Sequence, residues 1–362
     1  MKHIKLSDPV ITKDEKNAVM KVLNSGYLAS GKDVSEFETN FAKYIGTKHA
    51  IAVSNGTTAL HAALISKGIA SGDKVLTTPF TFIASSNVIL HTNAKPVFCD
   101  IDEKTYDLDP NKVETILKKQ KNIKAILLVH LYGQVCDMDA FKFLAKKYKV
   151  SLIEDCAQSI GSQYKNKHTG SIGDLGCFSF YATKNMMTGE GGMITTNNTS
   201  LNNKLRQIIN HGRLDRFKHN VLGYNFRMTN IAASIGNVQL KKLEEFTTKR
   251  IKNAELYNKL FAENKNIITP YVPSNTKHSF HQYAILVNPK RRNSIIEHLK
   301  KHNVDSAAIY ALTIPAQPLY KKMGYKELSI AKKVSNSVIC IPVHPKLTKS
   351  DIIQVAKLIK QV

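Results

Sequence analysis

The sequence lacks several features that would place the protein in a special class. No apolar run approaches the roughly 18–20 residues that a membrane-spanning helix needs. The five cysteines are well separated and form no CxxC pair, so we expect neither a disulfide framework nor a zinc site. No internal repeat or low-complexity tract occurs. The first residues, MKHIKLSDPVIT, carry no apolar run behind their lysines, so we expect no secretory signal and a cytoplasmic protein.

Acidic residues are also scarce. The 52 Lys and Arg residues stand against 28 Asp and Glu residues, which gives a formal net charge of +24, and only seven of the 52 are arginines. Nucleic-acid binding is one interpretation of such a surplus, but the lysines are spread along the chain and no nucleic-acid motif accompanies them. We favour a solvated lysine surface that attracts a phosphorylated substrate.

What is present is the pattern of a large α/β protein. The chain has 362 residues, 43% of them hydrophobic, which suits about two or three globular domains. From residue 49 to 200, short β-branched runs alternate with helical patterns, and several runs are apolar on both faces, as in strands covered by helices on either side. We expect about seven strands, mostly parallel, at 49–53, 74–79, 96–101, 123–130, 150–157, 175–180 and 191–196.

The pattern changes near Gln239. Residues 240–264 place leucines and other apolar residues on one stripe, which predicts a single long helix. After a loop at 270–276, strand-like and helical stretches predict a smaller α+β domain, and Thr348 and Asp351 have capping-box spacing before its last helix. We therefore expect a large domain over residues 1–240, and a linking helix with a small C-terminal domain over residues 241–362.

Three segments carry residues suited to chemistry. Residues 54–58, SNGTT, follow the first strand and open a helix, which would make an anion site, although a plain N-cap is the commoner explanation of such a turn. Asp155 ends the strand SLIED, with Gln158 three residues later, and alone it could equally be a helix cap. Lys184 lies in a glycine-bounded turn between two strands, where a lysine can be held rigidly and desolvated, so that its pKa falls toward nucleophilic use.

Taken together and in order, these segments resemble the DegT/DnrJ/StrS sugar aminotransferases, which are pyridoxal-phosphate (PLP) enzymes of aminotransferase fold type I. The resemblance runs from SDPVIT at 7–12 to the C-terminal helix. Its most specific blocks are SNGTTALHAAL, TPFTFIASSN, VHLYGQVCDMD, LIEDCAQSIGS, GDLGCFSFYATKNMMTGEGGM, NHGR and LGYNFRMTNIAASIGNVQL.

The resemblance implies roles around the cofactor ring. Lys184 would be the lysine that forms the Schiff base with PLP, and its presence favours a transaminase, because a related branch of sugar dehydratases has histidine at this place. Asp155 would pair with the pyridine nitrogen and stabilise its protonated form. Gln158 would lie beside the ring oxygen, and Phe82 would stack on the ring face.

The resemblance also implies how the phosphate is held. Gly56, Thr57 and Ser179 would supply hydrogen-bond donors, joined across a dimer interface by Asn225 from a second subunit. The expected protein is thus a homodimer with shared active sites, and no metal ligand cluster is needed.

The implied reaction moves an amino group from glutamate, by way of PLP, to a keto group of a nucleotide-linked (deoxy)sugar in surface-polysaccharide or other glycan precursor biosynthesis. The alternatives are a PLP-dependent sugar dehydratase on the same scaffold, disfavoured by Lys184, and a non-catalytic protein that binds PLP or nucleic acid. We expect no nucleic-acid or membrane partner. Pro315 stands where the family often has a histidine, which leaves the sugar open. We assign no role to His130, His211 or Tyr224.

Overall fold

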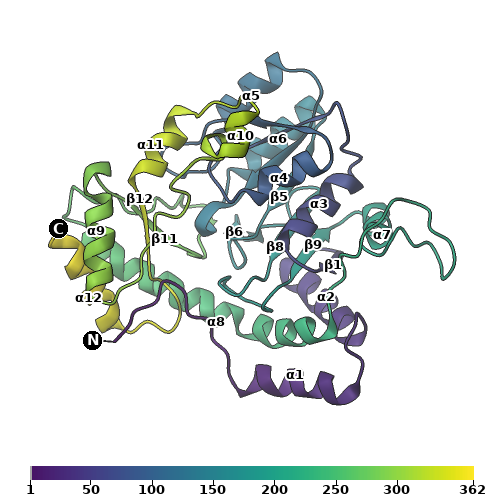
Figure 1. Ribbon diagram of the computed structural model, residues 1–362, viewed down its shortest axis with the longest axis horizontal. Coiled ribbons are helices and arrows are strands. Elements are labelled where there is room, and N and C mark those ends of the chain that lie inside the picture. The colour runs from purple at the N-terminus through teal and green to yellow at the C-terminus, as the bar shows by residue number, and fades with distance from the viewer. Residues whose placement is uncertain (1) are drawn as a thin grey trace.

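The computed structural model describes residues 2–362 and is built around a seven-stranded sheet (Figure 1). The strand order is β1-β9-β8-β5-β4-β2-β3, and β9 is the one strand of this sheet that runs antiparallel to its neighbours. Each strand falls within a predicted run or begins one residue before it, so the predicted α/β fold is confirmed. The strands are β1 (His49–Val53), β2 (Lys74–Thr77), β3 (Lys95–Phe98), β4 (Ile123–Val129), β5 (Ser151–Asp155), β8 (Leu175–Ser179) and β9 (Gly192–Thr196).

Helices cover both faces of this sheet. Successive strand residues point to opposite faces, so Ile51 and Val53 of β1 pack into one apolar cluster while Ala50 and Ala52 pack into another. The first face is covered by α3 (Gly56–Ser66), α4 (Ala84–His91) and α7 (Thr199–Ile208). The second face is covered by α2 (Lys32–Ile45), α5 (Pro110–Lys119), α6 (Met138–Tyr148) and the first half of α8 (Asn230–Phe261). Burial on both sides explains why the strands are apolar throughout.

The long helix α8 begins earlier than its sequence pattern predicts. It starts at Asn230, capped by the side chain of Thr229, rather than at residue 240. Its first turns are rich in small residues and carry no wide apolar stripe. They fit because small residues allow close packing: a Cβ on Gly236 would come within 2.7 Å of the Phe37 ring of α2. The preceding helix α1 (Lys13–Ser25) also packs along α8.

A further apolar cluster lies at the C-terminal end of the molecule. There β11 (Tyr283–Leu286) pairs antiparallel with β12 (Val338–Ile341), beside α9 (Pro289–Lys301) and α12 (Lys349–Lys360). Helix α11 (Ser329–Ser337) instead buries Ala331 and Val334 in the cluster on the first face of the main sheet. The predicted capping box is confirmed: the Thr348 amide donates to Asp351 Oδ2 at 2.9 Å, and the Asp351 amide donates to Thr348 Oγ1 at 3.2 Å.

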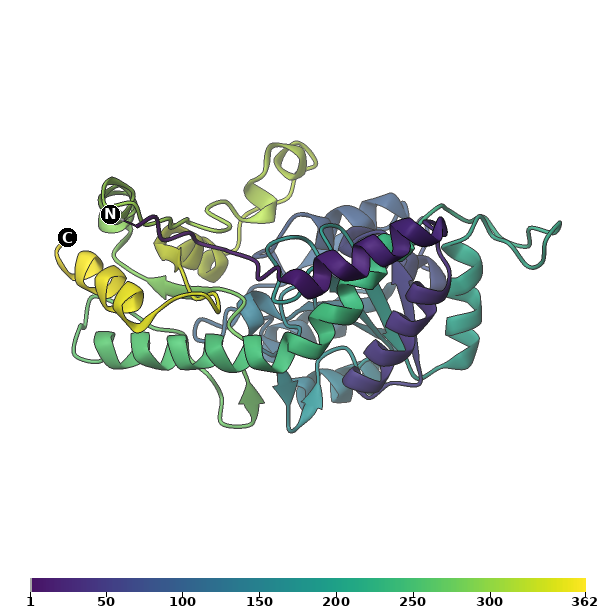
Figure 2. The ribbon, with the colours of Figure 1, turned by 90° about the horizontal axis from the view of Figure 1, so that it is seen from below.

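The two ends of the chain meet in this C-terminal region (Figure 2). Ile4 is 2% exposed and packs in the same cluster as α12, and its amide donates to the Asn303 carbonyl. Helix α8 passes without a break through the predicted boundary at 240/241, with its first half against α2 and its second half in the C-terminal cluster. The division into two domains at that point stays a prediction.

Short elements that have no periodicity were not predicted. The strands β6 (Gln163–Tyr164), β7 (Lys167–His168) and β10 (Thr276–Lys277) form a small three-stranded sheet. The remaining elements are the 3₁₀ turns η1 (Leu131–Gly133) and η2 (Ile314–Ala316) and the helix α10 (Pro318–Lys322). Among residues 2–362, no helix combines the length and apolar character that crossing a bilayer requires.

Candidate active site

The carboxyl ends of the parallel strands surround a cavity of about 720 Å³. The chain leaves β1 into Gly56 at the start of α3, and it leaves β2 toward Phe82. Asp155 ends β5 and Ser179 ends β8. The connection from β8 to β9 then carries Lys184 into the same cavity. Open α/β sheets bind their ligands at this edge, because all the loops that follow parallel strands meet there.

One end of the cavity is suited to an anion. Asn55 caps α3 by accepting the Thr58 amide at 2.9 Å. Within residues 2–362, the amides of Gly56 and Thr57 have no acceptor from the chain. Glycine is required for the close approach of α3 to β8, since a Cβ on Gly56 would lie 2.8 Å from Ser179 Cβ. Two free amides at a helix N-terminus beside the Ser179 hydroxyl fit a phosphate group.

Asp155 provides a buried carboxylate at the floor of the cavity. It is 4% exposed, and its two oxygens accept hydrogen bonds from Ser85 Oγ at 2.8 Å and from the Ala157 amide at 3.1 Å. Burial raises the pKa of this carboxyl, and the hydrogen bonds and the Lys184 charge oppose the rise. A carboxylate that faces a cavity with so few donors fits a cationic N–H group such as a protonated pyridine nitrogen.

The Lys184 amine shares this cavity with Asp155. Burial lowers its pKa to about 8, although the Asp155 charge acts in the opposite direction. The loop around it is held firmly: the Lys184 amide donates to the Tyr181 carbonyl at 2.9 Å, and the Asn185 side chain donates to the Ser279 carbonyl at 3.3 Å. A fixed lysine whose neutral form is populated near pH 8 can act as a nucleophile and as a carrier of protons.

The cavity gathers nearly all the residues that the sequence predicted. Its lining includes Gly56, Thr57, Phe82, Asp155, Gln158, Ser179 and Lys184. The Phe82 ring is 58% exposed and leaves a flat apolar face open to the cavity. The lining therefore offers groups suited to the phosphate, the ring nitrogen, the ring face and the aldehyde carbon of PLP. The role of each residue stays a prediction.

Asn225 lies outside this cavity. Its side-chain oxygen accepts from Arg227 Nε at 3.1 Å, and its backbone forms a bridge with Asn210. Its expected contribution to the site of a second subunit therefore stays a prediction.

Several residues of the cavity were not predicted. Ser85 donates to Asp155 and lies one helical turn after Phe82. Its place in the sequence, close to a predicted cofactor residue, is the signal that could have indicated it. His281 and Gln282 reach the cavity from the C-terminal part of the chain, and no local pattern places them there. Tyr310 also lines the cavity, in the 310–320 loop that the family resemblance places near the active site. Burial, together with the nearby Lys184 and Arg250 charges, lowers the pKa of His281 well below its usual value, so its ring is neutral.

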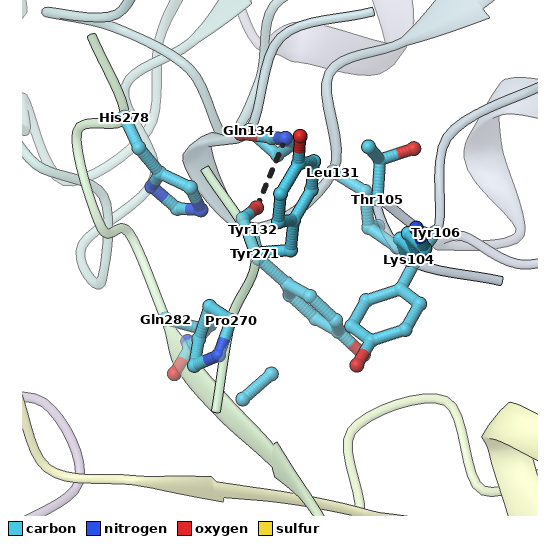
Figure 3. Close-up of a pocket in the computed structure, with 11 residues that line it drawn as sticks. Lys104, Thr105, Tyr106, Leu131, Tyr132, Gln134, Pro270, Tyr271, His278 and Gln282 are labelled. Carbon is cyan, nitrogen blue, oxygen red and sulfur yellow. Dashed lines mark hydrogen bonds between the residues drawn. The ribbon is translucent and has the colours of Figure 1, made fainter. Parts of the chain in front are cut away.

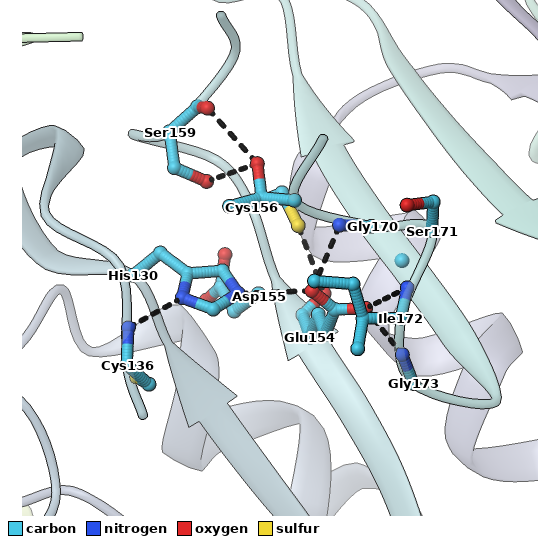
Figure 4. Close-up of polar contacts among 12 residues, drawn as sticks. His130, Cys136, Glu154, Asp155, Cys156, Ser159, Gly170, Ser171, Ile172 and Gly173 are labelled. Carbon is cyan, nitrogen blue, oxygen red and sulfur yellow. Dashed lines mark hydrogen bonds and ion pairs between the residues drawn. The ribbon is translucent and has the colours of Figure 1, made fainter. Parts of the chain in front are cut away.

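Behind Asp155, a second buried carboxylate has a different environment (Figure 4). Glu154 accepts from His130 Nε2 at 3.0 Å and from three backbone amides, those of Gly170, Ile172 and Gly173, at 2.6–2.9 Å. The Cys136 amide donates to His130 Nδ1, which leaves the other ring nitrogen as the donor. His130, Glu154 and the neighbouring Cys156 thiol lie close enough to hold a metal ion, but the imidazole and the carboxylate already bind each other and the backbone, which makes the pair structural.

The fold and the cavity define an aminotransferase of the PLP-dependent class, and comparison with known proteins agrees. Residues 9–360 match the model of the DegT/DnrJ/EryC1/StrS aminotransferase family, and the chain belongs to this family. It is 36% identical to a GDP-perosamine synthase of Caulobacter vibrioides over 99% of this chain and 98% of that one. It is 35% identical to a UDP-2-acetamido-2-deoxy-3-oxo-D-glucuronate aminotransferase of Pseudomonas aeruginosa over 92% of each chain.

Solved structures support the same conclusion. The PLP form of Spr1654 from Streptococcus pneumoniae superposes with a TM-score of 0.94 at 28% identity, over 99% of this chain and 98% of that one. The protein is therefore a PLP-dependent sugar aminotransferase with the fold of that class. The relatives support this activity over the sugar dehydratase and the non-catalytic binding protein that the sequence left open.

Proposed function

We propose that the protein transfers an amino group from glutamate to a keto carbon of a nucleotide-linked sugar, and that the product feeds surface-polysaccharide or other glycan synthesis. The observation that carries this proposal is the presence of the desolvated Lys184 amine and the buried Asp155 carboxylate in one cavity, beside the free amides of α3. PLP, when bound, supplies a carbonyl that exchanges amino groups and a ring that takes up electrons.

In this proposal the chain's own residues divide the work. Gly56, Thr57 and Ser179 hold the phosphate, and Asp155 keeps the ring nitrogen protonated. Lys184 Nζ, in its neutral form, takes a proton from the substrate carbon that bears the nitrogen and returns it on the cofactor side. General acid and base transfer of this kind contributes roughly 10²–10⁴ in rate. Phe82 covers the ring face and excludes water.

Two observations support a nucleotide-linked acceptor. The two curated relatives named above carry a GDP-linked and a UDP-linked sugar in their names. The net charge of +24 also favours a diphosphate over a neutral substrate, because a surplus of surface lysines attracts anions. The nucleotide moiety would supply binding energy remote from the reacting carbon.

The test is a panel of nucleotide-linked 3-keto and 4-keto sugars, each incubated with PLP, glutamate and the enzyme. We expect one of them to gain an amine, read by mass, while glutamate yields 2-oxoglutarate. The same sugar without its nucleotide should react far more slowly. The proposal is wrong if none of the panel is aminated and a simple 2-keto acid is aminated well.

We further propose that the enzyme works as a cytoplasmic homodimer. All five cysteines are buried free thiols, which suits a reducing compartment. The segment between α7 and α8 projects from the body with Phe217 83% exposed and Leu222 81% exposed, a surface that a second copy would cover (Figure 2).

Complementation tests the shared site. Mixing Lys184→Ala protein with Asn225→Ala protein should restore partial activity, because one site of each hybrid dimer would be intact. Demonstrated subunit exchange without any return of activity would contradict the contribution of Asn225.

A further inference from the structure

The long helix α8 buries one arginine that has no acidic partner. Arg250 is 5% exposed, and burial lowers its pKa to about 10. Burial is the one cause of this shift, so no carboxylate of residues 2–362 lies near enough to neutralise the guanidinium. Its buried Nε also has no hydrogen-bond partner among these residues. A buried charge that lacks a counter-charge costs stability, which indicates a role beyond holding the fold together.

The guanidinium of Arg250 binds the segment that leads into β11. Its Nη1 donates to the Phe280 carbonyl at 3.2 Å and to the His281 carbonyl at 3.4 Å. Phe280 has φ 47°, in the left-handed region that an aromatic residue rarely occupies. Such a conformation persists where the surroundings impose it, and two successive carbonyls held by one guanidinium are a constraint of this kind.

The turn η1 packs tightly on the same segment, residues 278–282 (Figure 3). The Gln282 amide donates to the Tyr132 carbonyl at 3.1 Å. A Cβ on Gly133 would lie 2.8 Å from the Phe280 nitrogen. The hollow that remains beside the segment measures about 10 Å³, room for about one water molecule. The segment therefore has little room to shift.

The His281 side chain connects this segment to the loop of Lys184. His281 Nδ1 lies 3.3 Å from Asn185 Oδ1. The Asn185 amide nitrogen donates to the Ile160 and Ser279 carbonyls at 3.4 and 3.3 Å, so its oxygen faces the ring. That oxygen can only accept, so His281 carries its proton on Nδ1. Because Asn185 directly follows Lys184, the histidine holds the residue next to the lysine.

Two cations face the His281 ring. The Lys184 and Arg250 charges act together with burial to lower the pKa of His281 well below its usual value, so the ring is neutral. The neutral ring keeps its one proton on Nδ1 for Asn185, and it places no further charge in the cavity that it lines. The position and the protonation state of this ring therefore both depend on its surroundings.

We propose that Arg250 is a positioning residue for the cofactor lysine: by holding the Phe280 and His281 carbonyls, it keeps the His281 ring on Asn185 and so fixes the loop that carries Lys184. Arg250 is not part of the cavity lining, so it acts through these residues. The inference rests on the proposed role of Lys184 and is independent of which sugar is aminated. A neutral side chain at this place would leave both carbonyls without their donor and would let His281 take a second proton.

The test uses the Arg250→Met variant, which keeps a long side chain and removes the charge and the donors. Arg292→Met is the matched control, because Arg292 Nη1 also donates to a backbone carbonyl, that of Ser335, at 2.8 Å, away from the cavity lining. The first readout is NMR of the cofactor-free protein with isotope-labelled histidine, where the His281 signals are those lost in His281→Asn. Between about pH 8 and pH 5, we expect a neutral ring protonated on Nδ1 in the wild type and the control. In Arg250→Met, the other tautomer or the charged ring should appear in this range.

The second readout is the rate of PLP attachment to Lys184 in the cofactor-free protein. We expect this rate to fall about three- to tenfold in Arg250→Met, the effect of one or two lost hydrogen bonds. It should recover in part in Arg250→Lys, which restores the charge and one donor group but not the planar fork. Arg292→Met should stay within about twofold of the wild type.

A second pair of variants decides the matter if Arg250→Met does not fold. His281→Asn keeps an amide donor near the place of Nδ1, whereas His281→Leu has none. We expect PLP attachment to be about three- to tenfold slower in His281→Leu than in His281→Asn. An unchanged His281 spectrum in Arg250→Met, or equal attachment rates in the two His281 variants, would overturn the inference. PLP attachment to a lysine other than Lys184 would contradict the proposed function, and the positioning role would fall with it.

Discussion

Adjacent residues of β5 carry two buried carboxylates, and the environments of these two groups differ sharply. Glu154 and Asp155 point to opposite faces of the sheet, as successive strand residues do. Glu154 accepts four hydrogen bonds, and these outweigh burial and lower its pKa. Asp155 accepts only two, and burial raises its pKa.

The number of hydrogen bonds that each carboxylate accepts distinguishes a structural role from a ligand-binding one. A buried carboxylate whose acceptors are all used has nothing left to offer a ligand, and it holds together the loops whose amides it binds. A buried carboxylate that faces a cavity and still has unused lone pairs can bind a cationic group there. The same functional group therefore anchors the 170–173 loop in one case and is predicted to meet the cofactor in the other.

The largest expected effect comes from Asp155→Asn. The amide cannot hold the ring nitrogen protonated, so we expect turnover to fall about 100- to 1,000-fold, the usual cost of a removed charge-stabilising group. The free energy of unfolding should change little, because the remaining oxygen can accept from the Ala157 amide while the new NH2 group donates to the Ser85 hydroxyl oxygen. Steady-state rates and urea unfolding measure the two quantities. Near-normal turnover would show that Asp155 only caps the turn after β5.

Glu154→Gln should show the reverse. In this variant an NH2 group replaces one carboxylate oxygen, and it faces backbone N–H groups that need an acceptor. The variant should therefore lose about 3 kcal/mol of unfolding free energy. Because the folded-state pKa of Glu154 is lowered from 4.5, its contribution is present above that value and is lost as the pH falls through the folded pKa. Urea titrations at several pH values test this, with turnover per folded molecule expected within about threefold of wild type. A stable but inactive variant would contradict the assignment.

A smaller effect concerns the ionisation of Lys184. Its pKa of about 8 means that the neutral amine dominates above pH 8. Covalent attachment of PLP to the cofactor-free protein should therefore accelerate up to about pH 8 and then level off, whereas an ordinary lysine would keep accelerating toward 10.5. Asp155→Asn should move this midpoint down, because the carboxylate that favours the protonated amine is removed. Glu154→Gln should leave the midpoint unchanged. Equal shifts of the midpoint in both variants would contradict the different roles given to the two carboxylates.

Much of this site could be predicted from the sequence because it depends on short segments. Asp155, Ser179 and Gly56 each stand at or just beyond the end of an apolar strand, and parallel strands bring such positions to one edge. The local order along the chain therefore fixes the cofactor end of the cavity. The start of α8 could not be predicted from periodicity, because its first turns consist of small residues that form no apolar stripe. They are helical because they pack closely against Phe37 of α2.

The contacts that the C-terminal part of the chain makes with the cavity could not be predicted in the same way. Gln158 and Tyr310 are far apart in sequence, and their hydrogen bond depends on how the C-terminal part packs against the sheet. The saturation of the Glu154 oxygens also emerges only when the 170–173 loop is in place. Periodicity carries no information about such contacts, and the predicted role of Asn225 would need a second chain to be seen.

The most direct test of the account is the identity of the lysine that binds the cofactor. The protein is reconstituted with PLP, reduced with borohydride, digested and mapped by mass spectrometry. We predict a single phosphopyridoxyl adduct on Lys184, in the peptide that contains FYATKNMMTGEGG. An adduct on any other lysine, or none after reconstitution, would contradict the site described above.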